Sequence, residues 1–224
     1  MSYGVKFEEA LLYAARLHRD QTRKGTDTPC ITHLLAVATI VGENGGTEDE
    51  VVAALLHDAP EDQGGEERLE DIRTRFGDAV AKVVSGCTDT YEELKPAWRQ
   101  RKEAIRSKRM ASAPASARLV SAADKLHNAR SILADLRSLG DDLWDRFTGG
   151  KEGTLWYYRA LVEAYEAAGA NPVVEELDRV CERSKPSRGA PQQRNISRRD
   201  AGSCIERAGK RREEESPCMI ERYA

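Results

Sequence analysis

The spacing of apolar residues limits most strongly what this chain can fold into. They recur every three to four positions along most of the first 184 residues. In the opening segment this i, i+3, i+4 order places Phe7, Ala10, Leu11, Ala14 and Leu17 on one helix face. No segment sustains the period-two alternation of a half-buried strand. The pattern predicts an all-α fold, a compact single-domain bundle of about eight to ten helices.

Local signals set several helix boundaries. A helix is predicted from His33 to Asn44, with Gly45-Gly46 ending it. Thr47, with Glu50 three residues later, has the pattern of a capping box that starts the next helix. Pro60 disfavours helical geometry at the residue before it, so this helix should end near Asp58. Further helices are predicted at 69–76, 78–85, 96–109, 114–139, 141–147, 154–168 and 172–183, the first two each closed by a glycine.

Composition divides the chain in two. Residues 1–184 form the predicted domain, whereas 185–224 are rich in Pro, Ser, Gly and Arg and are predicted to be a disordered, charged tail. The net charge is −3, but ten Lys/Arg and six Asp/Glu lie in the tail, which leaves the domain at −7. Nucleic-acid binding requires a basic face, so we expect no nucleic-acid partner.

Neither a membrane nor an oxidising compartment is indicated. The chain has no run of about 20 apolar residues, the length that a membrane span requires. Its first ten residues, MSYGVKFEEA, lack the apolar segment of a signal peptide. The five cysteines form no CxxC pair. We therefore expect a cytoplasmic protein with reduced cysteines and no membrane partner.

Two histidines and two aspartates stand where a polar side chain is costly. His57-Asp58 ends an apolar helix, His33 opens another, and Asp124 interrupts a third. Burying these groups is unfavourable unless something compensates them, and a divalent cation would. Imidazole and carboxylate ligands suit Mn²⁺, Fe²⁺ or Zn²⁺. The four residues therefore form a candidate site for one divalent metal ion, with positions left open for water and substrate.

Each of these residues has a simpler interpretation when taken alone. An isolated histidine on an apolar face is usually hydrogen-bonded within the core, and Asp124 could pair with Lys125. The combination favours the metal site, because Glu61-Asp62 follows His57-Asp58 at once in a predicted turn. A bound divalent ion can activate water and polarise a phosphoryl oxygen, while a nearby carboxylate positions or deprotonates that water. A centre of this kind could therefore hydrolyse a phosphate ester.

Four segments carry a family resemblance. LLHDAPED, with TRKGTDTPCITHLLAVA before it and FGDAVAKVVSGCTD and AADKLHNAR after it, resembles the HD superfamily. More narrowly, the chain is similar to the hydrolase domain of RelA/SpoT proteins and to stand-alone small alarmone hydrolases. The resemblance implies an all-helical, Mn²⁺-dependent enzyme that removes the 3′-pyrophosphate from ppGpp or pppGpp, a small-molecule nucleotide.

The resemblance also implies roles for individual residues. The implied metal ligands are His33, His57, Asp58 and Asp124, the acidic pair that acts on water is Glu61 and Asp62, and the residues that contact the nucleotide are Arg23, Lys24, Lys102 and Asn128. Cys30 departs from the family pattern, in which an aromatic residue is common at this position. His18 is predicted to be a core or supporting histidine, and no role is predicted for His127.

Two other functions fit the same pattern. One is an HD phosphohydrolase that acts on another nucleotide, such as a deoxynucleoside monophosphate. The other is a non-catalytic module that binds a nucleotide and senses it without turnover. The intact acidic pair, Glu61 and Asp62, argues against the non-catalytic module.

Overall fold

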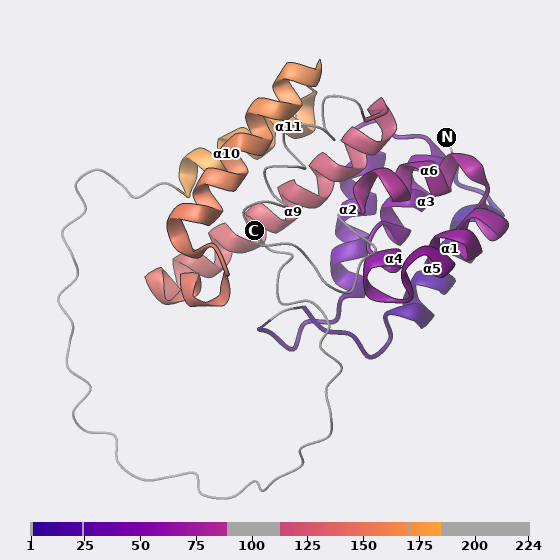
Figure 1. Cartoon of the computed structure of the whole chain (residues 1–224), viewed down its shortest axis with the longest axis horizontal. Helices are drawn as coiled ribbons and strands as arrows, with labels where there is room; N and C mark the ends of the chain where they lie inside the picture. The colour runs from indigo at the N-terminus through magenta and orange to yellow at the C-terminus, as the bar shows by residue number, and fades with distance from the viewer. Residues whose placement is uncertain (1, 24, 89–112, 170, 185–224) are drawn as a thin grey trace, which may run out of the picture.

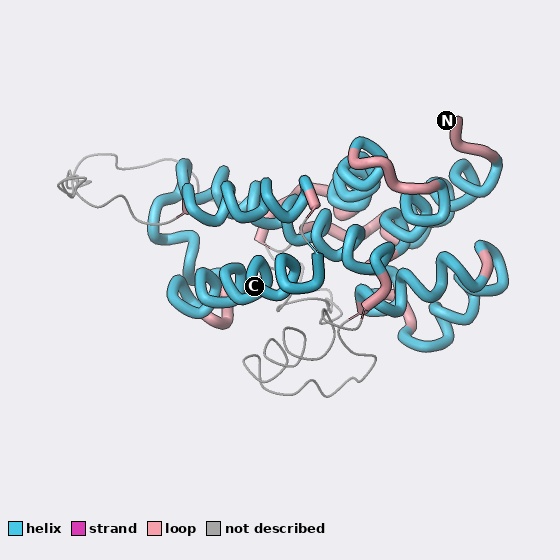
Figure 2. Tube along the Cα trace, turned by 90° about the horizontal axis from the view of Figure 1, so that it is seen from above, coloured by secondary structure: helices cyan, strands magenta, loops and turns pink. Residues whose placement is uncertain are grey.

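The structure, a computed structural model, describes residues 2–23, 25–88, 113–169 and 171–184. Over these residues it consists of nine α-helices and one 3-10 helix without a strand, which confirms the predicted all-α fold (Figure 2). The predicted helix at 96–109 and the predicted tail at 185–224 lie outside the described residues. The domain boundary at residue 184 stays a prediction.

Most predicted helices are present, with boundaries shifted by a few residues. In chain order they are α1 (Val5–Leu17), α2 (Ile31–Glu43), α3 (Glu48–Leu56), α4 (Ala59–Asp62), α5 (Gly65–Phe76), α6 (Asp78–Cys87), α9 (Ala115–Leu139), η2 (Gly140–Arg146), α10 (Gly150–Gly169) and α11 (Pro172–Arg183).

Helix α9 is the spine of the fold. It packs against α2, α3 and α6 on one side and against η2 and α11 on the other, and Figure 1 shows it crossing between these two groups. Its buried residues are therefore not confined to one stripe: Val120, Ala122, Ala123 and Leu126 are all at most 1% exposed. A polar side chain on this helix is consequently brought into the interior of the protein.

The capping box before α3 is confirmed. The Thr47 hydroxyl accepts a hydrogen bond from the backbone N–H of Glu50, and the Glu50 carboxylate accepts one from the backbone N–H of Thr47 at 2.7 Å. Together these bonds satisfy two N–H groups that the first helical turn leaves without partners. The cap fixes where α3 begins and therefore where it presents its last residues.

The predicted turn after Asp58 is wrong, because this segment forms the short helix α4. Pro60 lies in its first turn, where the missing N–H costs nothing and the fixed φ suits a helix. The proline therefore separates α3 from α4 instead of ending helical structure. As a result, Asp62 lies one turn after Asp58, with its backbone N–H bonded to the Asp58 carbonyl at 3.1 Å.

The predicted end of α6 at a glycine is also wrong. Helix α6 continues through Gly86 to Cys87. A Cβ atom added at Gly86 would lie 2.7 Å from the Cβ of Ala117 on α9. The absence of a side chain therefore serves the close approach of two helices, not the termination of one.

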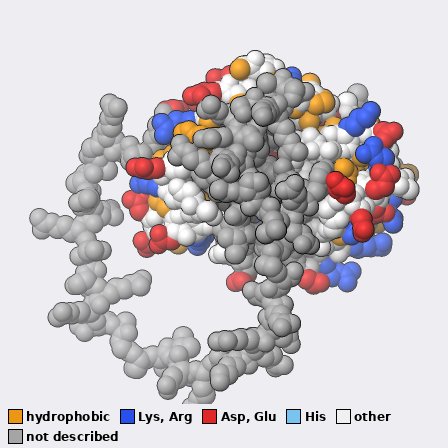
Figure 3. Space-filling view, viewed as in Figure 1, with side chains coloured by type: hydrophobic (Ala, Val, Ile, Leu, Met, Phe, Trp, Pro, Cys, Tyr) orange, Lys and Arg blue, Asp and Glu red, His pale blue; other side chains and the backbone are white. Residues whose placement is uncertain are grey.

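Charged side chains are mixed over the visible surface. On the face drawn in Figure 3, among the described residues, acidic and basic side chains are interspersed and do not separate into a basic face. None of the helices in the described part of the chain has the length and hydropathy needed to cross a bilayer.

We expect Gly86→Ala to destabilise the fold. In an unhindered helix this change would stabilise by about 1 kcal/mol through helix propensity. Contact with Ala117 instead forces α6 and α9 apart, which should lower the free energy of unfolding by about 1–3 kcal/mol. Urea denaturation would measure it. Lys82 is exposed on the same helix. The difference in free energy of unfolding between Lys82→Gly and Lys82→Ala therefore measures the effect of helix propensity alone. Stabilisation by Gly86→Ala would contradict the tight contact.

Candidate metal centre

Three helix segments bring the four predicted ligands together. His33 lies in the first turn of α2, His57 and Asp58 lie between α3 and α4, and Asp124 lies in the middle of α9. Nε2 of His33 is 3.2 Å from Oδ1 of Asp124 and 3.7 Å from Oδ2 of Asp58. Nε2 of His57 is 3.3 Å from Oδ1 of Asp58 and 3.9 Å from Oδ1 of Asp124.

These separations suit a single cation. Ligand atoms that each lie about 2.1 Å from one ion are separated from one another by roughly 3–4 Å. The side chains are also withdrawn from solvent, since His33 is 1% exposed and His57 is 3% exposed. Two imidazoles and two carboxylates in such a space form an N/O donor set for a divalent ion.

The ring of His57 shows most directly that a cation fits. Its Nδ1 lies 2.8 Å from the carbonyl oxygen of Ala54, so this nitrogen carries the proton and donates it. The lone pair is therefore on Nε2, a buried atom without a hydrogen-bond partner in the described structure. Burying an unsatisfied acceptor costs free energy that a metal ion would recover. This held tautomer is the usual arrangement of a metal-binding histidine.

Asp124 is held by neighbours on its own helix. Its carboxylate accepts a hydrogen bond from Nδ2 of Asn128 at 2.7 Å and pairs with Nζ of Lys125 at 2.8 Å. Burial raises the pKa of Asp124, but Lys125 and the two histidines outweigh burial and hold it well below the usual range. The carboxylate is thus ionised. Asp124 pairs with Lys125, as one interpretation of the sequence predicted, and it also belongs to the cluster.

Arg23 and Asn128, both predicted to contact a nucleotide, are joined next to this cluster. Nη2 of Arg23 donates to Oδ1 of Asn128 at 2.8 Å, although 105 residues separate them in the chain. The amide of Asn128 thus links the Arg23 guanidinium to the Asp124 carboxylate. The other two predicted contacts, Lys24 and Lys102, lie outside the described residues.

His127 has a place that the sequence did not predict. Its Nδ1 lies 2.8 Å from Nδ1 of His33. If Nε2 of His33 binds a metal, the proton of that ring is on Nδ1 and is donated to His127. His127 must be neutral to accept it, and burial, helped by the charges of His33 and Arg23, lowers the pKa of His127 to about 4. Its spacing of three residues from Asp124 was the available signal, because such residues share a helix face.

The acidic pair lies on α4, directly after Asp58. Glu61 and Asp62 are both half-buried. Oδ2 of Asp62 accepts a hydrogen bond from Nε2 of Gln21 at 2.9 Å, so a residue of the loop after α1 holds this carboxylate. Gln21 is a second residue whose contribution the sequence did not predict.

A pocket of about 270 Å³ opens beside the cluster. Arg23 and His127 form part of its wall, which connects it to the predicted metal ligands. Arg146 and Phe147, which follow α9, add an aromatic ring and a second guanidinium, which pairs at 3.3 Å with the carboxylate of Asp135 on the same wall. These groups suit an anionic, planar ligand, since guanidinium groups bind phosphate and stack on rings.

Comparison with known proteins identifies the family. Residues 10–155 match the model of the HD domain. The chain belongs to the HD domain family. In this HD protein the His57-Asp58 pair lies between α3 and α4.

Two curated relatives differ greatly in length. The HD protein is 41% identical over 128 residues to a GTP pyrophosphokinase of Streptomyces coelicolor. The aligned residues make up 57% of this chain but 15% of the relative. It is 36% identical over 132 residues to the guanosine-3′,5′-bis(diphosphate) 3′-pyrophosphohydrolase MESH1 of Drosophila melanogaster, covering 58% of this chain and 70% of the relative.

A solved structure extends the likeness to most of the fold. It is described as a metazoan orthologue of SpoT that hydrolyses ppGpp and plays a role in starvation responses. The TM-score is 0.64 and the sequence identity is 28%, with 81% of this chain and 97% of that one covered.

We expect His127→Phe to weaken metal binding without unfolding the protein. Phenylalanine keeps the ring but removes the acceptor that orients His33, so Mn²⁺ affinity should fall by roughly 10–100-fold. Isothermal titration calorimetry on metal-free protein would measure this. His57→Ala, which removes a predicted ligand, should abolish binding and serves as the reference for complete loss. Unchanged affinity in His127→Phe would show that His127 does not support His33.

Proposed function

We propose that this HD protein is a Mn²⁺-dependent phosphohydrolase that removes the 3′-pyrophosphate from guanosine 3′,5′-bispyrophosphate. The observation that carries the proposal is the cluster of His33, His57, Asp58 and Asp124 beside a pocket with cationic groups on its wall. The names of the MESH1 relatives and of the matched solved structure support this substrate.

The proposed metal ligands are His33, His57, Asp58 and Asp124. When bound there, a divalent ion supplies a water of lowered pKa and polarises a phosphoryl oxygen. Asp124 remains ionised through Lys125 and so contributes negative charge to the centre. The N/O donor set without a thiolate suits Mn²⁺ better than a softer ion.

The proposed base is one of the two carboxylates on α4. Asp62 lies one helical turn after the proposed ligand Asp58, so the two residues are on the same side of α4. The hydrogen bond from Gln21 to Oδ2 orients this carboxylate, which is the proposed acceptor of the proton from water. Glu61 is next to it and shares the task of positioning the water. The water oxygen bonds to phosphorus as the bond from phosphorus to the ribose 3′-oxygen breaks. The carboxylate takes the water proton, and the departing 3′-oxygen takes a proton from solvent.

The pocket is the proposed site of the nucleotide. A guanidinium can stack on a purine face or pair with phosphate, and Arg23 lies at the pocket wall that touches the cluster. Its bond to Asn128 holds it in place, so little side-chain entropy is lost when the ligand binds. Asn128 and Arg23 are thus proposed to position the nucleotide, and Lys24 and Lys102 are proposed contacts from outside the described residues.

A panel assay tests the substrate directly. Purified protein with Mn²⁺ is incubated with ppGpp, pppGpp, NADPH and deoxynucleoside monophosphates, and the products are identified. We expect pyrophosphate and guanosine 5′-diphosphate from ppGpp. Faster turnover of another nucleotide would support the alternative of a different HD phosphohydrolase. Binding of ppGpp without turnover of any nucleotide would support the sensing module.

Substitution on α4 should separate chemistry from metal binding. The two variants are Asp62→Asn and Glu61→Gln, and one of them removes the base. We expect that variant to have a kcat lower by about 10²–10⁴-fold, because general base catalysis typically contributes this factor. Mn²⁺ binding should persist in both variants, since neither residue is among the four proposed Mn²⁺ ligands. Steady-state kinetics and calorimetry measure the two effects. Near-full kcat in both variants would exclude the proposed role of this pair.

Substitution of Arg23 tests nucleotide recognition. We expect Arg23→Ala to raise KM for ppGpp far more than it lowers kcat, because ground-state binding worth about 1–3 kcal/mol is lost. The kinetics are compared with those of Arg73→Ala. Arg73 lies in α5 and pairs with Glu70 and Asp78, so it is a matched control for removing an arginine. Equal effects of the two substitutions would remove Arg23 from the substrate site.

A further inference from the structure

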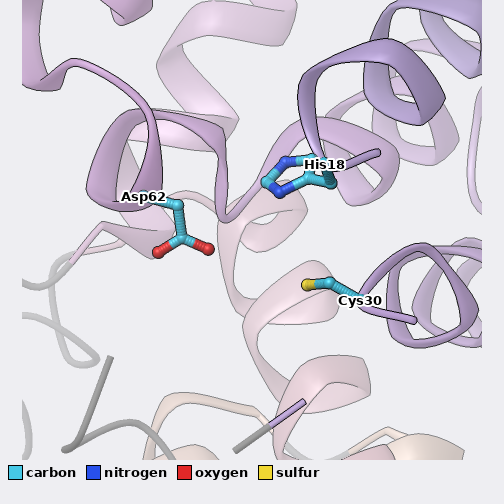
Figure 4. Close-up of side chains that lie close together, drawn as sticks. All are labelled: His18, Cys30 and Asp62. Carbon is cyan, nitrogen blue, oxygen red and sulfur yellow. The ribbon is translucent and has the colours of Figure 1, made fainter. Parts of the chain in front are cut away.

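A second cluster of metal-ligating side chains lies next to the first. It contains His18 at the end of α1, Cys30 at the start of α2 and Asp62 at the end of α4. One ring nitrogen, the thiol sulfur and one carboxylate oxygen all lie within 4.8 Å of one another. Figure 4 shows the three side chains, from separate segments, turned toward a common space.

The environment of this cluster is one that a metal site requires. His18 is 1% exposed and Cys30 is 3% exposed, so the imidazole and the thiol are withdrawn from water. The ligand atoms of a tetrahedral zinc site lie roughly 3.3–3.8 Å apart. Side-chain adjustments of about 1 Å would therefore bring the three atoms around one ion.

Hydrogen bonds fix which nitrogen of His18 could bind a cation. An ionised carboxylate only accepts, so Nε2 of Gln21 must face Asp62, and it does so at 2.9 Å. Oε1 of the same amide then faces Nδ1 of His18 at 2.5 Å and accepts its proton. The other ring nitrogen, Nε2, keeps the lone pair and is buried. In metal-binding histidines, the nitrogen that binds the ion is the one opposite such a hydrogen bond.

We propose that His18, Cys30 and Asp62 form a second cation site, selective for Zn²⁺ or another divalent ion that prefers thiolate. The thiol proton of Cys30 is released to solvent when the ion binds. Three protein ligands leave a fourth position for water. The donor set distinguishes this site from the first, because a thiolate favours soft ions whereas imidazole and carboxylate alone accept Mn²⁺.

Occupation of the second site inhibits hydrolysis. This consequence, unlike the site itself, rests on the proposed function. Asp62 is shared between the thiolate cluster and the proposed chemistry, and a carboxylate bound to zinc is a weaker acceptor of the water proton. The ion therefore inactivates the enzyme by occupying Asp62 without displacing the ion held by the four other ligands.

Cobalt spectroscopy tests the site independently of activity. Co²⁺ is titrated into metal-free, full-length protein. We expect two ions per chain and a thiolate-to-cobalt charge-transfer band in the near ultraviolet, because a cobalt–sulfur bond forms. Cys30→Ser should lose the band and one of the two ions. It should keep Mn²⁺ binding at the first site, which also shows that the variant is folded.

The other cysteines provide matched controls for the origin of the band. Each is replaced by serine in turn, at Cys87, Cys181, Cys204 and Cys218, and the band should persist in all four variants. His18→Gln should weaken cobalt binding and change the intensity of the visible bands, because a ligand is lost. The absence of a charge-transfer band in the wild-type protein, or its persistence in Cys30→Ser, would overturn the second site.

Inhibition by zinc tests the link to Asp62. Zn²⁺ is added to the Mn²⁺-loaded protein during turnover, and the concentration for half inhibition is measured. For Cys30→Ser, the zinc concentration for half inhibition should be at least roughly tenfold higher. The activity of this variant without zinc should equal that of the wild-type protein. Equal sensitivity of the two proteins would overturn the inhibitory role. A protein that shows the cobalt band but hydrolyses no nucleotide would refute the proposed function while leaving the second site intact.

Discussion

The structure depends on the burial of imidazole and carboxylate groups where three helices meet. His33, His57 and Asp124 are each at most 8% exposed, and the atoms that would bind a metal face one another. Such a concentration of lone pairs and negative charge is unfavourable in an apolar interior unless a cation or a set of fixed donors compensates it. The described structure supplies part of this compensation through Lys125 and Asn128, and a divalent ion would supply the rest.

Helix α9 makes this burial possible. It contacts helices on both sides, so a residue at nearly any angle around its axis can be in the interior (Figure 1). Asp124, His127 and Asn128 use this position to contact, respectively, the cluster, the ring of His33 and the guanidinium of Arg23. The same helix therefore connects the proposed metal ligands to the pocket. Its close approach to α6 at Gly86 fixes the position of this helix relative to α6.

Helix α4 connects the two candidate cation sites. Asp58 precedes this helix and belongs to the first cluster, while Asp62 ends it and belongs to the second. Gln21 bridges Asp62 and His18, so the loop after α1 determines the orientation of the carboxylate that the proposed chemistry uses. The second set of donors contains a thiolate and the first does not. Because a thiolate favours softer ions, the two neighbouring sites can select different ions.

The sequence by itself determined the local structure and the identity of the polar residues placed at helix ends. The all-α fold, the capping box of Thr47 and the HD domain family followed from spacing and short motifs, because helix period and cap chemistry act over a few residues. The sequence also predicted the four candidate ligands, which the structure brings together, although their binding of a metal stays a prediction.

Only the tertiary structure decided which distant side chains meet. The contact of His127 with His33 and the bond from Arg23 to Asn128 span 94 and 105 residues. Helix spacing places His127 and Asn128 on the same face as Asp124, but it does not identify their partners on other segments. The sequence predicted a helix stop at Gly86 and a turn at Glu61-Asp62, whereas the close approach of α9 and the position of Pro60 in a first turn gave a different outcome. The thiolate cluster arises in the same way, because three segments must pack before Cys30 lies beside His18 and Asp62.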